Sequence, residues 1–170
     1  MTTVATSAVL DDVAAKLGGT VERVRVGEPR IIEEFRKRGG DFGGEENGGV
    51  IFPDWLLCRE GIMTALKFIE LLDREAKSVS QLDASLPRYY QIKQKIECPE
   101  RLKPKVLPAL EKRFKGYKLD RTDGLRVVFD DGWLLVRASG TEPIFRCFAE
   151  ARDQERAEEL AGRGMKELRA

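Results

Sequence analysis

The stretch Trp133-Leu-Leu-Val-Arg-Ala-Ser-Gly-Thr-Glu-Pro-Ile-Phe-Arg-Cys-Phe148 places a polar loop between two apolar runs. Residues 133–136 and 144–148 are rich in aromatic and aliphatic side chains, so each run predicts a β-strand. The residues between them are typical of a turn. The stretch therefore predicts two neighbouring strands of one antiparallel sheet, joined by a short loop.

This loop carries groups that can bind an anion. Ser139 and Thr141 offer hydroxyl donors, and Gly140 permits a positive φ that would let successive N–H groups converge. Arg137 and Arg146 flank the loop, and a guanidinium group matches two phosphate oxygens at once. The alternative is an ordinary β-hairpin turn with solvated arginines. Composition alone favours that alternative, because such turns are common.

The composition limits the classes of function. With 170 residues, 42% of them hydrophobic, the chain is long enough for one ordinary domain or two small ones. Thirty basic and 29 acidic residues give a net charge of +1, so the charge supports neither a nucleic acid nor a membrane as partner. Histidine is absent, which excludes imidazole bases, nucleophiles and metal ligands. Any anion site must therefore be local.

The cysteines and the first residues indicate a cytoplasmic protein. Cys58, Cys98 and Cys147 are odd in number and lack CxxC spacing, so neither a disulfide framework nor a zinc site is supported. We expect buried thiols in a reducing compartment. No apolar run approaches a membrane-spanning length, and the start of the chain lacks the basic and apolar regions of a signal peptide.

The first part of the chain alternates β-type and α-type patterns. Residues 2–6 and 21–26 are β-prone, whereas residues 7–17 and 29–38 carry helical apolar stripes. The order βαβα predicts a layered α/β unit with parallel strand pairing. Because the first strand begins almost at Met1, we expect a partial βαβα unit whose preceding region is missing.

A glycine-rich loop, Phe42-Gly-Gly-Glu-Glu-Asn-Gly-Gly49, precedes a β-prone run. Its glycines let the backbone approach a ligand closely. Glu45 and Asn47 are two positions apart, so their side chains can point to the same side, where a carboxylate and an amide suit vicinal sugar hydroxyls. A flexible connecting loop explains the pattern equally well. A calcium-binding turn is disfavoured, because the oxygen ligands are too few and the EF-hand spacing is absent.

Two helical patterns and a domain boundary follow. Residues 61–73 carry an apolar stripe that we expect in the core, formed by Ile62, Ala65, Leu66, Ile69 and Leu72. Residues 78–86 predict a short helix capped by Ser78 or Ser80. The Pro87-Arg-Tyr-Tyr90 junction interrupts the helical pattern, which predicts two domains, residues 1–87 and 88–170.

The second domain has an α+β pattern. Residues 90–97 alternate as a strand does, and a proline-bearing turn then leads into a helix ending at Gly116. Asp-Gly turn signals at residues 122–124 and 130–132 separate further strands, and residues 153–168 form a final amphipathic helix. We therefore expect an antiparallel sheet with helices on one face.

Both loops resemble those of one enzyme family. Gly44-Glu-Glu-Asn-Gly-Gly49 resembles the sugar-recognition loop in the third domain of the α-D-phosphohexomutases, which comprise phosphoglucomutase, phosphomannomutase and phosphoglucosamine mutase. Arg137-Ala-Ser-Gly-Thr-Glu-Pro143 with Arg146 looks like the phosphate-binding loop of the fourth domain. Thr122-Asp-Gly-Leu125 and Gly132-Trp133 also look like landmarks of that domain. The resemblance covers essentially the whole chain.

The resemblance implies a cytoplasmic enzyme that interconverts hexose 1-phosphate and hexose 6-phosphate through a glucose or mannose 1,6-bisphosphate intermediate. It also implies a phosphoserine in a first domain and Mg²⁺ held by three aspartates in a second. Neither of those loops occurs in the 170 residues. We therefore expect most of domain three plus domain four, with no catalytic residue and no metal site of its own, whose partners are the missing N-terminal domains.

The resemblance also implies roles for single residues. Glu45 and Asn47 would contact sugar hydroxyls, and the phosphate would be held by Arg137, Ser139, Gly140, Thr141 and Arg146. Glu28 matches a third-domain loop that makes a polar substrate contact, although a carboxylate at a helix start is an equally good explanation. Gly49 stands where many relatives have His, so one sugar contact is missing or supplied elsewhere.

Three functional hypotheses remain at this point. The first is the substrate-binding C-terminal portion of a phosphoglucomutase or phosphomannomutase, inactive alone. A phosphoglucosamine mutase parent is its alternative, because neither loop distinguishes the substituent at C2 of the hexose. The second is a free-standing, non-catalytic phosphosugar-binding module. The third is a structural domain without affinity for phosphate.

Overall fold

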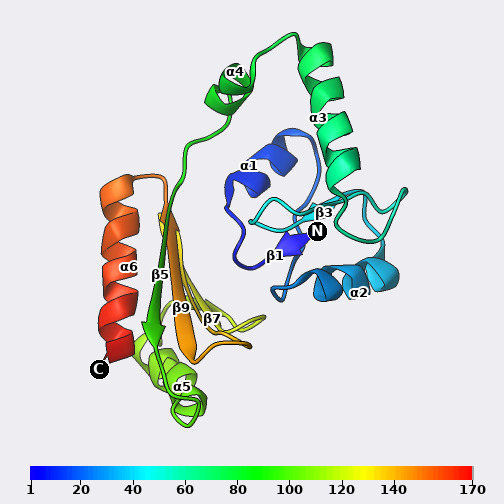
Figure 1. Cartoon of the computed structure of the whole chain (residues 1–170). Helices are drawn as coiled ribbons and strands as arrows, with labels where there is room; N and C mark the ends of the chain where they lie inside the picture. Colours follow the sequence, from blue (N-terminus) through cyan, green and yellow to red (C-terminus); the bar gives the residue numbers. More distant parts are fainter. Residues whose placement is uncertain (170) are drawn as a thin grey trace. The chain divides into compact units, whose positions relative to one another are not determined.

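The computed structural model describes residues 1–169 and divides the chain into two compact units, Met1–Arg88 and Tyr89–Ala170. Figure 1 shows a mixed arrangement of helices and strands, with the longer strands in the second unit. The predicted fold class, an α/β portion followed by an α+β portion, is confirmed.

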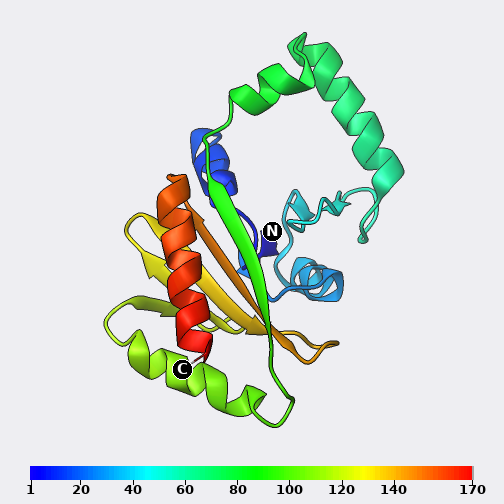
Figure 2. The same ribbon diagram turned by 60° about the vertical axis from the view of Figure 1, so that its left-hand side comes forward.

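The second unit is built on a five-stranded antiparallel sheet with the strand order β5-β9-β8-β7-β6. Its strands are β5 (Tyr90–Glu97), β6 (Lys118–Asp120), β7 (Leu125–Phe129), β8 (Gly132–Ala138) and β9 (Ile144–Ala151). The two Asp-Gly signals join β6 to β7 and β7 to β8, as predicted. Figure 2 shows the long strands β5 and β9 running side by side.

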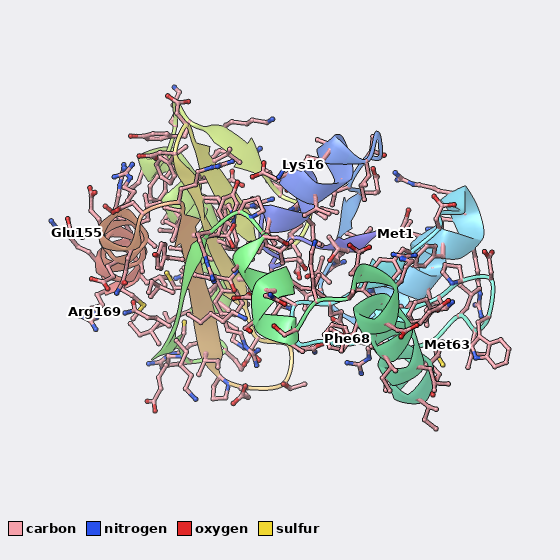
Figure 3. The ribbon with its side chains drawn as sticks, turned by 90° about the horizontal axis from the view of Figure 1, so that it is seen from above. Met1, Lys16, Met63, Phe68, Glu155 and Arg169 are labelled. Carbon is pink, nitrogen blue, oxygen red and sulfur yellow. The ribbon has the colours of Figure 1, made fainter. Side chains whose placement is uncertain are left out.

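Two helices, α5 (Lys103–Arg113) and α6 (Gln154–Arg169), cover one face of this sheet. Figure 2 shows α6 lying along the sheet, and Figure 3 shows it nearly end-on with Glu155 and Arg169 labelled. The core between helices and sheet includes Leu110 and Phe114 from the first helix region and Leu160 from α6. Alternate residues of β9 join it, namely Phe145, Cys147, Ala149 and Ala151, which is the period of two expected for the face of a strand that packs under helices.

The first unit contains four very short strands. They are β1 (Thr2–Thr3), β2 (Arg23–Val24), β3 (Gly43–Gly44) and β4 (Val50–Ile51), and the helices are α1 (Val9–Lys16), α2 (Glu28–Arg38), α3 (Gly61–Glu75) and α4 (Val79–Ala84). The pair β1–β2 is parallel, as predicted, and β3–β4 is antiparallel. A small core forms from Val24, Ile31, Phe35 and Ile51.

The expectation that the apolar stripe of α3 is core is wrong. No residue of α3 is buried, and Ile62, Leu66 and Ile69 keep 74%, 57% and 62% of their surface exposed. Helical periodicity identifies an apolar face, but it does not show whether another element covers that face. Figure 3 labels Met63 and Phe68 on this helix. The predicted cap of α4 is confirmed, since Ser78 Oγ accepts from Gln81 N and Ser78 N donates to Gln81 Oε1 at 2.8 Å.

The three cysteines are free thiols; Cys98 and Cys147 are buried and Cys58 is only half-buried. Burial raises the pKa of the Cys147 thiol to about 12. None of the helices within residues 1–169 is long and apolar enough to cross a membrane.

We expect Cys58 to react first with a water-soluble disulfide reagent at about pH 8, and Cys147 to stay unmodified. The reagent attacks thiolates, and burial keeps Cys147 protonated. Mass spectrometry of peptides from the labelled native protein identifies the modified thiols, and labelling in guanidinium chloride is the control in which every cysteine reacts. Rapid labelling of Cys147 in the folded chain would contradict its buried position.

Candidate functional site

Strand register brings Arg137 and Arg146 directly opposite each other. They are Cα partners across β8 and β9, at the end of the sheet where the loop of residues 139–143 joins the two strands. Their neighbours Val136 and Cys147 belong to the core beneath the helices. Because successive side chains of a strand point to opposite faces, both guanidinium groups lie on the face away from α5 and α6.

Each of these arginines pairs with a carboxylate. Arg137 Nε lies 3.1 Å from Asp123 Oδ2, and both side chains are largely buried, with 15% and 14% of their surface exposed. Arg146 Nη2 lies 3.0 Å from Glu142 Oε2 in a pair that is 40% and 48% exposed. The first pair holds its guanidinium in place, whereas an exposed pair of the second kind contributes only about 0–1 kcal/mol.

The loop itself is closed by Ser139. This residue is buried, its N–H donates to Ile144 O at 3.0 Å, and its Oγ accepts from the N–H groups of Thr141 at 3.4 Å and Glu142 at 3.2 Å. Gly140 is exposed and does not have a positive φ, so the expectation that it uses one is wrong. The serine hydroxyl gathers the N–H groups, and no left-handed residue is needed to do so.

Lys103 is a part of this loop that the sequence patterns did not reveal. Its Nζ donates to the carbonyl oxygens of Ser139 and Glu142, at 2.8 Å each, and its side chain is only 11% exposed. It also lies 2.5 Å from Glu100 Oε1. The ammonium thus ties both ends of the loop to the start of α5. Nothing local marks this lysine, because its partners are 36 and 39 positions away.

Gly124 places Asp123 against Arg137. It has a φ of +79°, and a Cβ there would lie 2.7 Å from Arg137 Cβ and 2.8 Å from Arg137 Cα, as well as in collision with Val136 O. Only a residue without a side chain lets the turn approach β8 so closely. The turn signal was visible in the sequence, but its contact with the arginine was not.

The glycine-rich loop of the first unit is compact. Glu45 N donates to Gly49 O at 2.9 Å, and Gly48 N donates to Glu45 O at 3.1 Å. Asn47 Oδ1 accepts from Gly49 N at 3.2 Å, so this oxygen stabilises its own loop. Thr2 Oγ1 donates to Gly44 O at 2.8 Å, which fixes the loop beside β1.

Arg59 joins two of the predicted site residues. Its backbone N–H and its Nε donate to the two oxygens of Glu28, at 2.7 and 2.9 Å, and its Nη1 lies 3.3 Å from Glu45 Oε2. The hydrogen bond from the Arg59 backbone, helped by the guanidinium, lowers the pKa of Glu28 below its usual value. The structure therefore brings Glu28 and Glu45 together, although they are 17 positions apart.

A pocket of about 610 Å³ lies beside this cluster, lined in part by Glu28, Gly49, Arg59, Thr64 and Phe68. Asn47 does not line it and is exposed at the tip of its loop. The sequence patterns did not predict a role for Arg59. Gly49 is a sequence feature that is related to Arg59, because a Cβ at position 49 would collide with Arg59 Cδ and lie 3.0 Å from Arg59 Cγ.

Comparison with known proteins assigns the family. The profile described as phosphoglucomutase/phosphomannomutase, alpha/beta/alpha domain III, matches residues 1–90, and the profile for the C-terminal domain matches residues 94–166. The chain belongs to the phosphoglucomutase/phosphomannomutase family. Its two units thus correspond to the C-terminal part of the family's proteins.

Curated relatives extend well beyond this chain. A phosphoglucomutase/phosphomannomutase of Thermococcus kodakarensis is 48% identical over 99% of the chain, which covers 37% of that protein. A phosphoglucosamine mutase of Methanococcus maripaludis is 35% identical over 97% of the chain, which covers 38% of it. The chain therefore spans somewhat more than a third of the length of these relatives.

Solved structures share the fold. A phosphoglucomutase/phosphomannomutase family protein from Burkholderia thailandensis matches 94% of the chain with a TM-score of 0.79 and 24% identity, over 34% of its own length. Parafusin, a phosphoglucomutase of Paramecium, matches 98% of the chain with a TM-score of 0.77 and 21% identity, over 37% of its length. Family members of low identity thus keep the same arrangement of elements.

We expect Gly124→Ala to destabilise the second unit by about 1–3 kcal/mol, because the new Cβ meets Arg137 and the left-handed backbone becomes strained. Urea unfolding measures the change. Gly162→Ala on α6 is the matched control: nothing lies within 4 Å of its Cβ position, so this change should be neutral or stabilising. Equal stability of the two variants would contradict the close approach at Gly124.

Replacing Lys103 by Met should loosen the loop at residues 139–143, since it removes the donor shared by two carbonyl groups. We expect a loss of about 1–3 kcal/mol in the free energy of unfolding and faster hydrogen exchange at Thr141 and Glu142. The control is Lys105→Met, an exposed lysine on the same helix. Unchanged exchange in the Lys103 variant would show that the loop does not depend on it.

Proposed function

We propose that this chain is the substrate-binding portion of a cytoplasmic phosphohexomutase, in which the first unit recognises the sugar and the second binds the phosphate. The parent reaction is the interconversion of hexose 1-phosphate and hexose 6-phosphate. Family membership supports the reaction class, and the observation that carries the proposal is the pair Arg137 and Arg146, facing each other across β8 and β9 beside the Ser139 loop.

The facing arginines favour an anion as ligand. Like charges directly opposite each other on neighbouring strands destabilise a sheet unless an anion compensates them. Asp123 and Glu142 provide that compensation within the chain. A phosphate brings about two negative charges and several acceptor oxygens, so it can take the place of the exposed Glu142 carboxylate on Arg146. The hydroxyl of Thr141 adds a neutral donor at the rim.

The first unit supplies the complementary groups for a sugar. Glu28 and Glu45 are acceptors held at one place, and the NH₂ group of Asn47 is a donor nearby in sequence. Vicinal hydroxyl groups both donate and accept, so they match such a set. This role of Glu28, Glu45 and Asn47 is part of the proposal.

We propose that Mg²⁺ is a cofactor of the parent enzyme and is held outside these two units. Within residues 1–169, no group of three or more Asp, Glu, Cys or His side chains is placed to hold a metal ion. A structural neighbour that is 17% identical, Aspergillus fumigatus N-acetylphosphoglucosamine mutase, is described in complex with GlcNAc-6P and magnesium. We therefore propose that the metal and the phosphoserine are supplied by domains other than these two, and that this chain alone binds without turnover.

The names of the relatives favour two parent activities. Relatives named phosphoglucomutase/phosphomannomutase and phosphoglucosamine mutase both cover nearly the whole chain. Glucose 1-phosphate and glucosamine 1-phosphate differ only at C2, so competition between them in a binding titration separates the two. Stronger binding of the amino sugar would assign the second activity.

We expect inorganic phosphate to shift the amide NMR signals of Ser139, Gly140 and Thr141, and Arg137→Ala to weaken this binding by about 1.5–3 kcal/mol, the range for a hydrogen bond to a charged group. Lys112→Ala, which removes an exposed charge from the same unit, is the control and should bind as the unaltered chain does. Silence of the loop amides at all phosphate concentrations would support the purely structural reading.

Mutase assays on this chain with glucose 1-phosphate or mannose 1-phosphate test the second half of the proposal. No conversion to the 6-phosphate is expected, because the chain lacks loops for the phosphoryl donor and the metal. Turnover by the purified chain would overturn the claim that catalysis requires further domains.

A further inference from the structure

The side chain of Arg59 occupies the space that a side chain at position 49 would fill. Gly49 follows the Glu45 loop, and a Cβ there would collide with Arg59 Cδ. The backbone of the arginine is fixed as well, because Arg59 N donates to Glu28 and the next residue, Glu60, donates its N–H to Val50 O at 3.0 Å. The missing side chain at Gly49 and the hydrogen bonds of the Arg59 and Glu60 backbones therefore place the arginine side chain beside the glycine loop.

This arginine connects two carboxylates that the chain brings from separate segments. Glu28 is the first residue of α2, whose Ile31 and Phe35 are buried, and Glu45 lies in the loop anchored to β1. Arg59 uses Nε for Glu28 and Nη1 for Glu45. Among residues 1–169 its other terminal nitrogen, Nη2, donates no hydrogen bond, and 41% of the side chain is exposed.

The neighbouring pocket has the surface that a pyranose ring requires. Glu28 and Arg59 contribute acceptors and donors to its wall, while Ala65 and Phe68 on α3 contribute apolar surface. Glu60 also lines the pocket, but its carboxylate caps α3 by accepting from the backbone N–H groups of Ile62 and Met63. The Glu60 carboxylate is therefore tied to the start of α3, and Arg59 with Glu28 forms the other charged part of the wall.

We propose that Arg59 is the positioning residue of a hydroxyl-binding pocket: its contact with the buried Glu45 carboxylate fixes the glycine loop at the pocket wall, and it holds the Glu28 carboxylate as an acceptor and offers Nη2 as a donor to one pair of vicinal hydroxyl groups. A hydroxyl that donates to a carboxylate can accept from the guanidinium, so Glu28 and Arg59 together match a diol. This inference rests on the proposed function, and it adds a residue that neither loop motif contains.

The rival explanation is a structural cross-link between α2 and the glycine loop. Both explanations predict that losing Arg59 lowers stability, so stability cannot separate them. A positioning role also requires that a sugar, as distinct from phosphate, is bound less tightly when Arg59 is replaced. The lowered pKa of Glu28, caused first by the Arg59 backbone N–H and then by its guanidinium, reports only whether the Arg59–Glu28 contact is present.

The test is an NMR titration of the full chain with glucose 1-phosphate and, separately, with inorganic phosphate. In the unaltered chain, glucose 1-phosphate should shift the amides of residues 44–49 as well as those of residues 139–141, and inorganic phosphate only the latter. Arg59→Gln should weaken the response of residues 44–49 about tenfold or more, the change expected for losing one charged hydrogen bond. The response of residues 139–141 to inorganic phosphate should stay the same.

A control variant, Arg30→Gln, and a conservative variant, Arg59→Lys, accompany Arg59→Gln. Arg30→Gln removes an arginine of the same unit that pairs with the exposed Glu33, and it should leave both responses unchanged. Arg59→Lys keeps the charge but cannot reach both carboxylates at once, so it should restore the sugar response only in part. If Arg59→Gln does not fold, the sugar response of Arg59→Lys tests the role of Arg59 in its place. In Arg59→Gln the pKa of Glu28, followed by its carboxyl carbon signal, should rise toward the ordinary value of 4.5.

The outcomes separate this inference from the proposed function. If residues 139–141 respond to phosphate but residues 44–49 are silent toward glucose 1-phosphate, or respond equally in Arg59→Gln, the role of Arg59 is overturned and the phosphate site stands. If residues 139–141 are silent toward both ligands, the proposed function itself fails.

Discussion

The pairing register of β8 and β9 is the constraint on which the second unit depends. It sends Val136 and Cys147 into the core beneath the helices and sets Arg137 opposite Arg146 on the other face. A slip by one residue would bring the guanidinium groups beneath the helices and turn the side chains of that core away from them, so the free energy of core packing also fixes the arginine pair. Core and candidate site are thus two consequences of one hydrogen-bond ladder, and a residue inserted into either strand would disturb both.

The first unit positions its polar groups in another way. Its strands are only two residues long, and a sheet of this size cannot hold side chains in register over any distance. Contacts between distant segments do so instead: Thr2 holds Gly44, and Arg59 holds Glu28 and Glu45. Two glycines are needed here because they lack a side chain. A Cβ at Gly43 would collide with the ring of Phe35, and a Cβ at Gly49 would collide with Arg59.

The sequence predicted best what depends on local pattern. Strand alternation located β5 from Tyr90 to Glu97, the Asp-Gly signals located two hairpins, and Ser78 capped its helix. The apolar stripe of α3 was also local, but its burial depends on a covering element that periodicity cannot show. The roles of Lys103 and Arg59 were not predicted for a related reason, because their partners lie 14 to 39 positions away along the chain. Contacts between residues so far apart along the chain are formed only by the folded structure, so local sequence patterns do not predict them.

The two arginines of the second unit differ in a way that bears on how a phosphate would be received. Asp123 holds Arg137 in a largely buried pair, so this guanidinium is already ordered and loses little conformational entropy when a ligand arrives. Arg146 is held by Glu142 in an exposed pair that is weak by comparison. Glu142 belongs to the loop itself, and its backbone is restrained by Ser139 Oγ and Lys103. Its side chain can therefore leave Arg146 without the loop opening. In the proposed role, Arg137 defines where the phosphate binds, and Arg146 exchanges an internal carboxylate for it.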